Sequence, residues 1–148
     1  VEHRIEHVRE LNGINFYNDA IATSPTRTIA SLSSFDKKVI LIAGGYDKKI
    51  PYDSMGKVIA EKVKVLVLVG QTAPLIEESF YKEKNVSGKG TDVQVFRCNT
   101  LEEAVVKAYT AAEEGDIVIL SPASASFDMF RNFEEKGNKF KEIVNSLV

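Results

Sequence analysis

Residues 39–45 of the chain, VILIAGG, form a continuous apolar run that ends in two glycines. Two more runs share this character, VLVLVG at residues 65–70 and DIVILS at residues 116–121. Runs rich in Val and Ile, without polar alternation, are typical of strands that are covered on both faces of a sheet. A shorter run, VQVF at residues 93–96, indicates a fourth such strand. The runs therefore predict a sheet buried between two layers.

Helical patterns separate these strands. Thr100 and Glu103 form a capping-box pattern at the start of one of them. The expected helices are residues 25–35, 54–63, 72–81, 100–114 and 128–147. Because strands and helices alternate with short connections, we expect an α/β fold with a doubly wound, mostly parallel, Rossmann-like sheet. The polar segment 82–91 predicts a surface loop.

The N-terminal part has a different pattern. In HVRELNGINFYND, residues 7–19, the pair Asn12-Gly13 lies between two short strand-like runs. Asn-Gly is the strongest short signal for a tight hairpin turn. The sequence therefore predicts an N-terminal β-hairpin before the alternating units.

Composition limits the classes of partner. The chain has 148 residues, with 19 basic and 21 acidic side chains and a net charge of −2. This size fits one domain, and the charge leaves no large basic field for nucleic acid or an anionic membrane. No apolar stretch approaches the roughly 18 residues of a membrane span. The single Cys98 excludes a disulfide within the chain and fits a reducing compartment such as the cytoplasm. Because the chain begins at Val1 without Met, we expect a fragment of a longer protein.

In doubly wound folds, ligands bind beyond the C-terminal ends of the strands. This rule selects the loops 18–25, 44–49, 70–74 and 121–127. In the loop 44–49, the two glycines permit close approach of a ligand and Lys48 or Lys49 supplies a cation; the alternative is a plain turn with solvated lysines. The loop lacks G-x-G-x-x-G, so it does not indicate a dinucleotide site.

The loop 18–25 places Thr23 and Ser24 before Pro25, which is typical of a helix N-cap. That interpretation leaves Asp19 without a role at its strand end. No Cys or carboxylate cluster at ligand spacing accompanies His3 and His7, so a metal site there is not indicated. SGKGT at residues 87–91 lacks the spacing of a P-loop.

The last segment, SPASASFDMFRNFEEKGNKF at residues 121–140, permits two interpretations. In one, Ser126 or Asp128 caps the final helix and the phenylalanines fill the core. In the other, Ser126 and the backbone N–H groups of the helix start hold a carboxylate, because a helix N-terminus favours anions. We expect Phe130 to be a core residue, whereas the role of Phe133 stays open at this point.

Four segments together resemble the C-terminal domain of the Mur ligase family: HRIEHV (3–8), NGINFYNDAIATSPTRTI (12–29), LIAGGYDKK (41–49) and LSPASASFDMFRNFEEKGNKF (120–140). They run nearly end to end in the family's order and spacing. The last segment is the most specific, because it resembles the branch that adds D-glutamate. The D-N-P-R-type motif of the diaminopimelate-adding branch is not present.

The resemblance implies the third domain of a three-domain enzyme of bacterial peptidoglycan synthesis, with residues 1–148 as the domain that binds the amino acid and closes over ATP. ATP converts the carboxylate of UDP-N-acetylmuramoyl-L-alanine to an acyl phosphate, and the amine of D-glutamate attacks it. The family's central domain carries the P-loop and the Mg²⁺ ligands. This chain has neither, so the resemblance implies no catalytic or metal-binding residue in it, and we expect the isolated domain to be inactive.

Transferred position by position, the resemblance implies a D-glutamate pocket and a contact with the nucleotide. The pocket comprises Thr23, Lys48, Ser126, Phe127 and Phe133. Arg4 corresponds to the family arginine that reaches the ATP phosphates, and Asp19 to the acid that contacts the nucleotide. The chain departs from the family where D-A-I-A-T-S at residues 19–24 replaces D-S-K-A-T-N, so that Ile21 occupies the position of a lysine.

Two alternatives stay open at this point. One is another Mur-type ligase or a folylpolyglutamate synthase, which share this domain. The other is a doubly wound binding module without catalytic activity.

Overall fold

The structure, a computed structural model, describes residues 1–148 and contains six strands and five helices. The strands are β1 (Glu6–Leu11), β2 (Ile14–Asn18), β3 (Val39–Ala43), β4 (Val63–Val69), β5 (Gln94–Cys98) and β6 (Ile117–Leu120). The helices are α1 (Pro25–Leu32), α2 (Met55–Lys62), α3 (Ala73–Ser87), α4 (Leu101–Ala111) and α5 (Phe133–Ser146). The alternation of strands and helices predicted from the apolar runs is confirmed.

All six strands form one sheet in the order β1-β2-β6-β3-β4-β5. Only β1 runs antiparallel, to β2, and every other neighbouring pair is parallel. The last strand, β6, therefore returns to the middle of the sheet, between β2 and β3. The prediction of a doubly wound, mostly parallel sheet with an N-terminal hairpin is confirmed. The C-terminal ends of β2, β6, β3 and β4 meet at one edge, which is where such sheets bind ligands.

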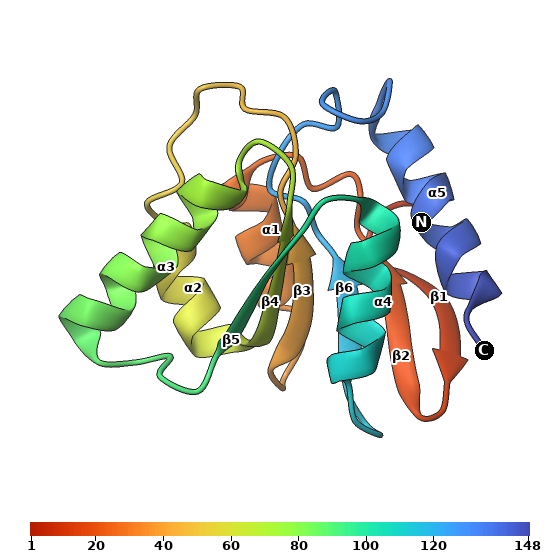
Figure 1. Cartoon of the computed structure of the whole chain (residues 1–148), viewed down its shortest axis with the longest axis horizontal. Helices are drawn as coiled ribbons and strands as arrows, with labels where there is room; N and C mark the ends of the chain where they lie inside the picture. The colour runs from red at the N-terminus through yellow and green to blue at the C-terminus, as the bar shows by residue number, and fades with distance from the viewer.

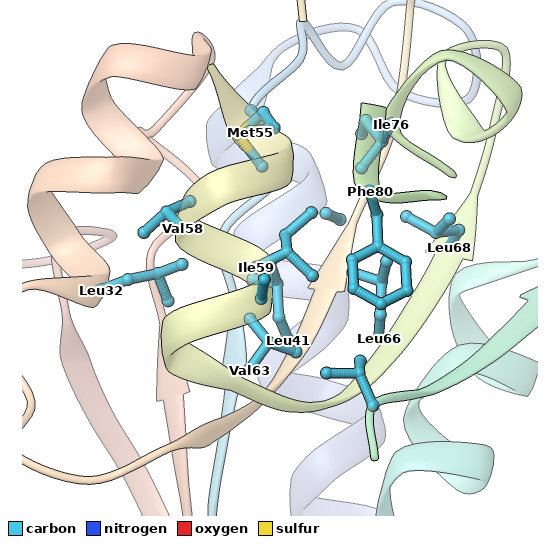
Figure 2. Packing of buried hydrophobic residues seen from close by; sticks show 14 of the residues in the cluster. Leu32, Leu41, Met55, Val58, Ile59, Val63, Leu66, Leu68, Ile76 and Phe80 are labelled. Carbon is cyan, nitrogen blue, oxygen red and sulfur yellow. The ribbon is translucent and has the colours of Figure 1, made fainter. Parts of the chain in front are cut away.

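The core consists of two apolar layers, one on each face of the sheet. Successive residues of a strand point to opposite faces, so Leu41 belongs to the layer under α1, α2 and α3, and Ile40 to the layer under α4 and α5. Figure 1 shows these two groups of helices on either side of the sheet. In Figure 2, Phe80 of α3 and Ile59 of α2 point toward Leu66 and the sheet. Burial of each such side chain stabilises the fold by about 1.5–3 kcal/mol.

The turn of the hairpin has the predicted residues and the expected backbone. Asn12 has φ +54° and Gly13 has φ +78°. A two-residue turn with both φ values positive matches the twist of the strands and favours Asn-Gly. This confirms the hairpin predicted from that pair.

Side-chain caps define the starts of three helices. Ser24 accepts a hydrogen bond from the Arg27 amide at the start of α1, and Thr100 accepts one from the Glu103 amide at the start of α4. The cap by Thr100 was predicted, and Ser24 is one of the two residues predicted for the other cap. The start of α5 was predicted wrongly, because neither Ser126 nor Asp128 caps it. Its N-cap is Asn132, whose Oδ1 accepts a hydrogen bond of 2.8 Å from the Glu135 amide.

The prediction of a loop at residues 82–91 was also wrong in part, since α3 continues to Ser87. The helix ends where Gly88 adopts a left-handed φ of +73° and donates its amide to the Lys84 carbonyl. None of the helices has the length and apolar composition needed to cross a bilayer.

Candidate functional site

Loops from four strand ends meet at the C-terminal edge of the sheet. The 121–132 segment lies between the β2–α1 loop and the β3–α2 loop, and backbone hydrogen bonds of 2.7–3.1 Å hold the loops together. These bonds join Ala123 N to Ala22 O, Gly44 N to Pro122 O, Tyr46 N to Ala125 O, and Thr72 N to Gly45 O. All four loops selected from the sequence therefore belong to one continuous surface.

Asp19 is buried at the end of β2 and is engaged on both carboxylate oxygens. Its Oδ1 accepts a hydrogen bond of 3.1 Å from the Ile5 amide, and its Oδ2 accepts one of 2.7 Å from Ser121 Oγ. Burial raises the pKa of Asp19, although the hydrogen bonds from Ser121 and Ile5 oppose this shift. The carboxylate thus fastens the N-terminal turn to the ends of β2 and β6.

Arg4 and Asp19 both line a pocket of about 340 Å³. The residues on either side of Arg4 have left-handed backbones, with φ +66° at His3 and +42° at Ile5. Arg27, on the first turn of α1, lines the same pocket. Guanidinium groups in such a pocket suit phosphate oxygens, which they bind with paired N–H donors.

The structure thus brings together the two residues that were predicted to contact the nucleotide, Arg4 and Asp19. It adds Arg27, which was not predicted from the sequence. Ile21, at the position of the family lysine, also lines this pocket.

The five residues predicted for the D-glutamate pocket lie on three loops of this edge and at the start of α5, and they are not gathered around one of the main surface pockets. None of four surface pockets of about 340–610 Å³ is lined by any of them. Lys48 is exposed and Thr23 is half-buried. Phe127 is 62% exposed, and its ring lies 6.0 Å from that of Tyr46 in a T-shaped arrangement.

Ser126 differs from the others because it is 2% exposed and its Oγ has no hydrogen-bond partner. Buried hydroxyl groups are normally hydrogen-bonded, so this one has unused capacity for a ligand. Phe130 and Phe133 differ less in burial than their predicted roles, core residue and pocket residue, imply. Both Phe130 and Phe133 are half-buried and pack against the core layer under α4 and α5, and Phe133 also contacts the ring of His3 edge-on at 5.9 Å.

A buried hydroxyl network joins three of the loops. Ser124 Oγ lies 2.8 Å from both Tyr52 Oη and Thr72 Oγ1, and Thr72 Oγ1 accepts a hydrogen bond of 3.0 Å from the Gly45 amide. Burial raises the pKa of Tyr52. The network was not found from the sequence, because its members are separated by 52 and 72 residues.

Two charged groups below the same loops were also missed. Lys136 of α5 is 2% exposed, and both carboxylate oxygens of Asp128 are buried without a hydrogen-bond partner. The sequence gives no signal for a buried lysine in the polar run NFEEKGNKF.

The chain contains no group of three or more His, Cys, Asp or Glu residues that could hold a metal ion. The residues at this edge that suit a ligand are instead arginines, a lysine and hydroxyl groups, which bind anions.

Comparison with known proteins relates the whole chain to one family. Residues 3–124 match the family model described as Mur ligase, glutamate ligase domain. A UDP-N-acetylmuramoylalanine–D-glutamate ligase of Acetivibrio thermocellus is 71% identical over 99% of this chain and 32% of its own length. The ligase of the same name from Ruminiclostridium cellulolyticum is 59% identical over the same shares. The chain thus spans about a third of the length of the curated relatives that it matches.

Solved structures with lower identity share the fold. A murein peptide ligase from Psychrobacter arcticus superposes with a TM-score of 0.63 at 16% identity, over 99% of this chain and 30% of that one. A bifunctional folylpolyglutamate synthase/dihydrofolate synthase from Yersinia pestis, complexed with AMPPNP and a Mn ion, also superposes with a TM-score of 0.63 at 16% identity. This match covers 97% of this chain and 32% of that one. The resemblance inferred from the four sequence segments is therefore confirmed: the chain belongs to the Mur ligase family.

Proposed function

We propose that this chain is the amino-acid-binding domain of a three-domain ligase that adds D-glutamate to UDP-N-acetylmuramoyl-L-alanine during peptidoglycan precursor synthesis in the bacterial cytoplasm. The observation that supports this most strongly is the identity of 71% and 59% with two ligases of that name, over 99% of this chain. Residues 1–148 form the C-terminal domain in this proposal, and the rest of the polypeptide provides the other two.

In the proposed reaction, ATP activates the carboxylate of the nucleotide substrate as an acyl phosphate. The amine of D-glutamate attacks the acyl carbon, and the tetrahedral intermediate collapses to the amide and phosphate. The residues of this chain bind and orient the amino acid and contact ATP. Mg²⁺ would be held mainly by the central domain, since this chain has no suitable cluster of ligands.

D-Glutamate has two carboxylates, and the proposed site would bind them with a cation and hydroxyl groups. Lys48 is exposed at the β3–α2 loop, where it can meet a carboxylate after domain closure. Ser126 has a free hydroxyl, and Thr23 lies on the neighbouring loop. A hydrogen bond to a charged group contributes about 1.5–3 kcal/mol, so a few such contacts account for specific binding. Phe127 contributes its backbone, and Phe133 lies at the start of α5.

Arg4 and Asp19 form the nucleotide side of the proposed site. Arg4 lies at a pocket with a second arginine, Arg27, and can reach the phosphates of ATP. Asp19 lines that pocket and fixes the backbone of Ile5 next to Arg4.

The test is ligase activity of the full-length protein that contains this chain. We expect phosphate release and amide formation from UDP-N-acetylmuramoyl-L-alanine and ATP with D-glutamate, and none with L-glutamate or diaminopimelate as acceptor. Turnover with a different amino acid or with a folate substrate would refute the proposed specificity.

The isolated chain should bind D-glutamate weakly and turn nothing over, because its proposed contacts line none of the four main surface pockets and closure onto the other domains would complete the site. Titration calorimetry that detects tight binding by the isolated chain would contradict this division of the site.

A further inference from the structure

Lys136 is a buried cation beneath the loop that carries Ser126 and Phe127. It lies on the second turn of α5, and its Nζ donates a hydrogen bond of 2.9 Å to the carbonyl oxygen of Gly44, at the end of β3. Its side chain therefore connects α5 directly to the sheet edge. An ammonium has three donors, and this is its one hydrogen bond within the chain.

Asp128 approaches the same place from the loop. Its Oδ2 lies 2.5 Å from the position that a Cβ on Gly70 would occupy, and that position is itself 2.9 Å from the Cα of Gly45. A Cβ on Gly45 would lie 3.4 Å from Lys136 Nζ. Two glycines at the ends of β3 and β4 thus leave space into which both charged groups extend.

The two charged groups in this space have fewer hydrogen bonds than buried charges normally have. Neither oxygen of Asp128 has a partner, and Lys136 forms no ion pair within 4 Å. Burial lowers the pKa of Lys136 to about 8, and the charge of Asp128 opposes that shift. The two charges therefore act on each other without direct contact, and removal of one leaves the other uncompensated.

The position of Asp128 determines the position of the proposed amino-acid contacts. Ser126 O accepts hydrogen bonds from the amides of Met129 and Phe130, at 3.2 and 2.8 Å, so residues 126–130 form a compact turn. Any displacement of Asp128 would move Ser126 and Phe127 with it.

We propose that Lys136 is a positioning residue of the amino-acid site, which acts with Asp128 to hold the 121–132 loop, and with it Ser126 and Phe127, against the ends of β3 and β4. This inference rests on the proposed function, since it assigns the loop to D-glutamate.

The kinetic test uses Lys136→Met in the full-length protein, because Met keeps most of the side-chain volume and removes the charge. We expect the KM for D-glutamate to rise by about tenfold or more, while kcat and the KM values for ATP and the nucleotide substrate stay unchanged. The matched control is Lys139→Met on the same helix, where the lysine is partly exposed and pairs with Glu142 at 3.4 Å. An unchanged KM for D-glutamate in Lys136→Met would overturn the inference.

A double variant tests the role of Asp128. Lys136→Met combined with Asp128→Asn should have a lower KM for D-glutamate than Lys136→Met alone, because it leaves no uncompensated buried charge. Simple additivity of the two single effects would overturn the pairing of these residues.

Hydrogen exchange separates positioning from a general loss of stability, and it also separates this inference from the proposed function. In Lys136→Met, the amides of Ala123 and Phe130 should exchange faster, while those of β4 keep their protection. Equal acceleration everywhere would identify a purely structural role and overturn the inference. Absence of D-glutamate-dependent turnover in the unmodified full-length protein would instead overturn the proposed function.

Discussion

The buried ammonium of Lys136 should make the stability of this chain increase with pH in a window where most proteins lose stability. Burial holds the pKa of Lys136 at about 8 in the folded state, compared with an ordinary value of 10.5. Between these two values the unfolded chain binds a proton at Lys136 that the folded chain has released. Stability therefore rises as the pH increases through this window, and the full contribution is present only above the unfolded value.

The size of this pH-dependent stabilisation follows from the difference between the folded and unfolded pKa values of Lys136. It corresponds to roughly 3 kcal/mol, which is an upper estimate because water penetration and relaxation reduce the cost of a buried charge. In Lys136→Met this contribution is absent. The free energy of unfolding of the variant relative to the unmodified chain should therefore fall by about 2–3 kcal/mol between about pH 7 and pH 10.5.

The variant Lys136→Met must be compared with the unmodified chain because other groups titrate in the same pH range. Burial raises the pKa of Tyr52 and of Cys98, and hydrogen bonding to Glu2 raises that of Lys141. These contributions are common to both proteins and cancel in the difference, provided that the substitution leaves their surroundings intact.

Urea unfolding followed by circular dichroism provides the measurement, because the chain has no Trp to serve as a fluorescent probe. Lys139→Met, on the exposed side of α5, should follow the unmodified chain at every pH. If the difference between Lys136→Met and the unmodified chain stays constant across the window, the ammonium is well solvated or well paired. The reasoning from burial would then be wrong.

Three further predictions concern the site and the core. In the full-length protein, Lys48→Ala should raise the KM for D-glutamate strongly and Lys49→Ala only slightly; equal effects would remove Lys48 from the pocket. Arg4→Ala should raise the KM for ATP and leave the KM for D-glutamate unchanged, as measured by steady-state kinetics with each substrate varied in turn. A raised KM for D-glutamate with an unchanged KM for ATP would contradict the role of Arg4. Phe80→Ala should lower the free energy of unfolding by about 3–5 kcal/mol in urea titrations, since Phe80 is fully buried, and a loss below about 1 kcal/mol would contradict its place in the core.

The sheet could be predicted from the sequence because its signals are local. The run VILIAGG becomes β3, in which every residue is buried, and Asn12-Gly13 forms the expected turn. The end of α3 was missed because polarity was taken to indicate a loop. Lys and Glu are good helix formers, and the last turns of α3 need no apolar face because they extend past Phe80, the last buried residue of the helix. Gly88 was the signal that could have located the helix end.

The details of the site depend on contacts that are distant in sequence. Several residues in SASFDMFRN can cap a helix, and only tertiary packing selects Asn132. The burial of Lys136 depends on the Gly44 carbonyl, 92 positions away, which accepts its hydrogen bond, and on Gly45, which leaves space beside its Nζ. The helix-cap interpretation left Asp19 without a role, and its partners Ile5 and Ser121 appear only in the fold.

The distribution of unsatisfied groups at this edge supports the assignment of the 121–132 loop to a ligand. Asp19 has partners on both oxygens, and Ser124 is bonded to two hydroxyl groups. The buried side-chain atoms without a partner are Ser126 Oγ and the two oxygens of Asp128, all within three residues of one loop. The other buried polar side chains of this fold have hydrogen-bond partners, so the absence of partners for Ser126 Oγ and the Asp128 oxygens is a local feature. Local energetic strain concentrates at functional sites. In the proposed site, the energetic cost of holding Lys136 and Asp128 in place would be part of binding, because it would fix the loop before the amino acid arrives.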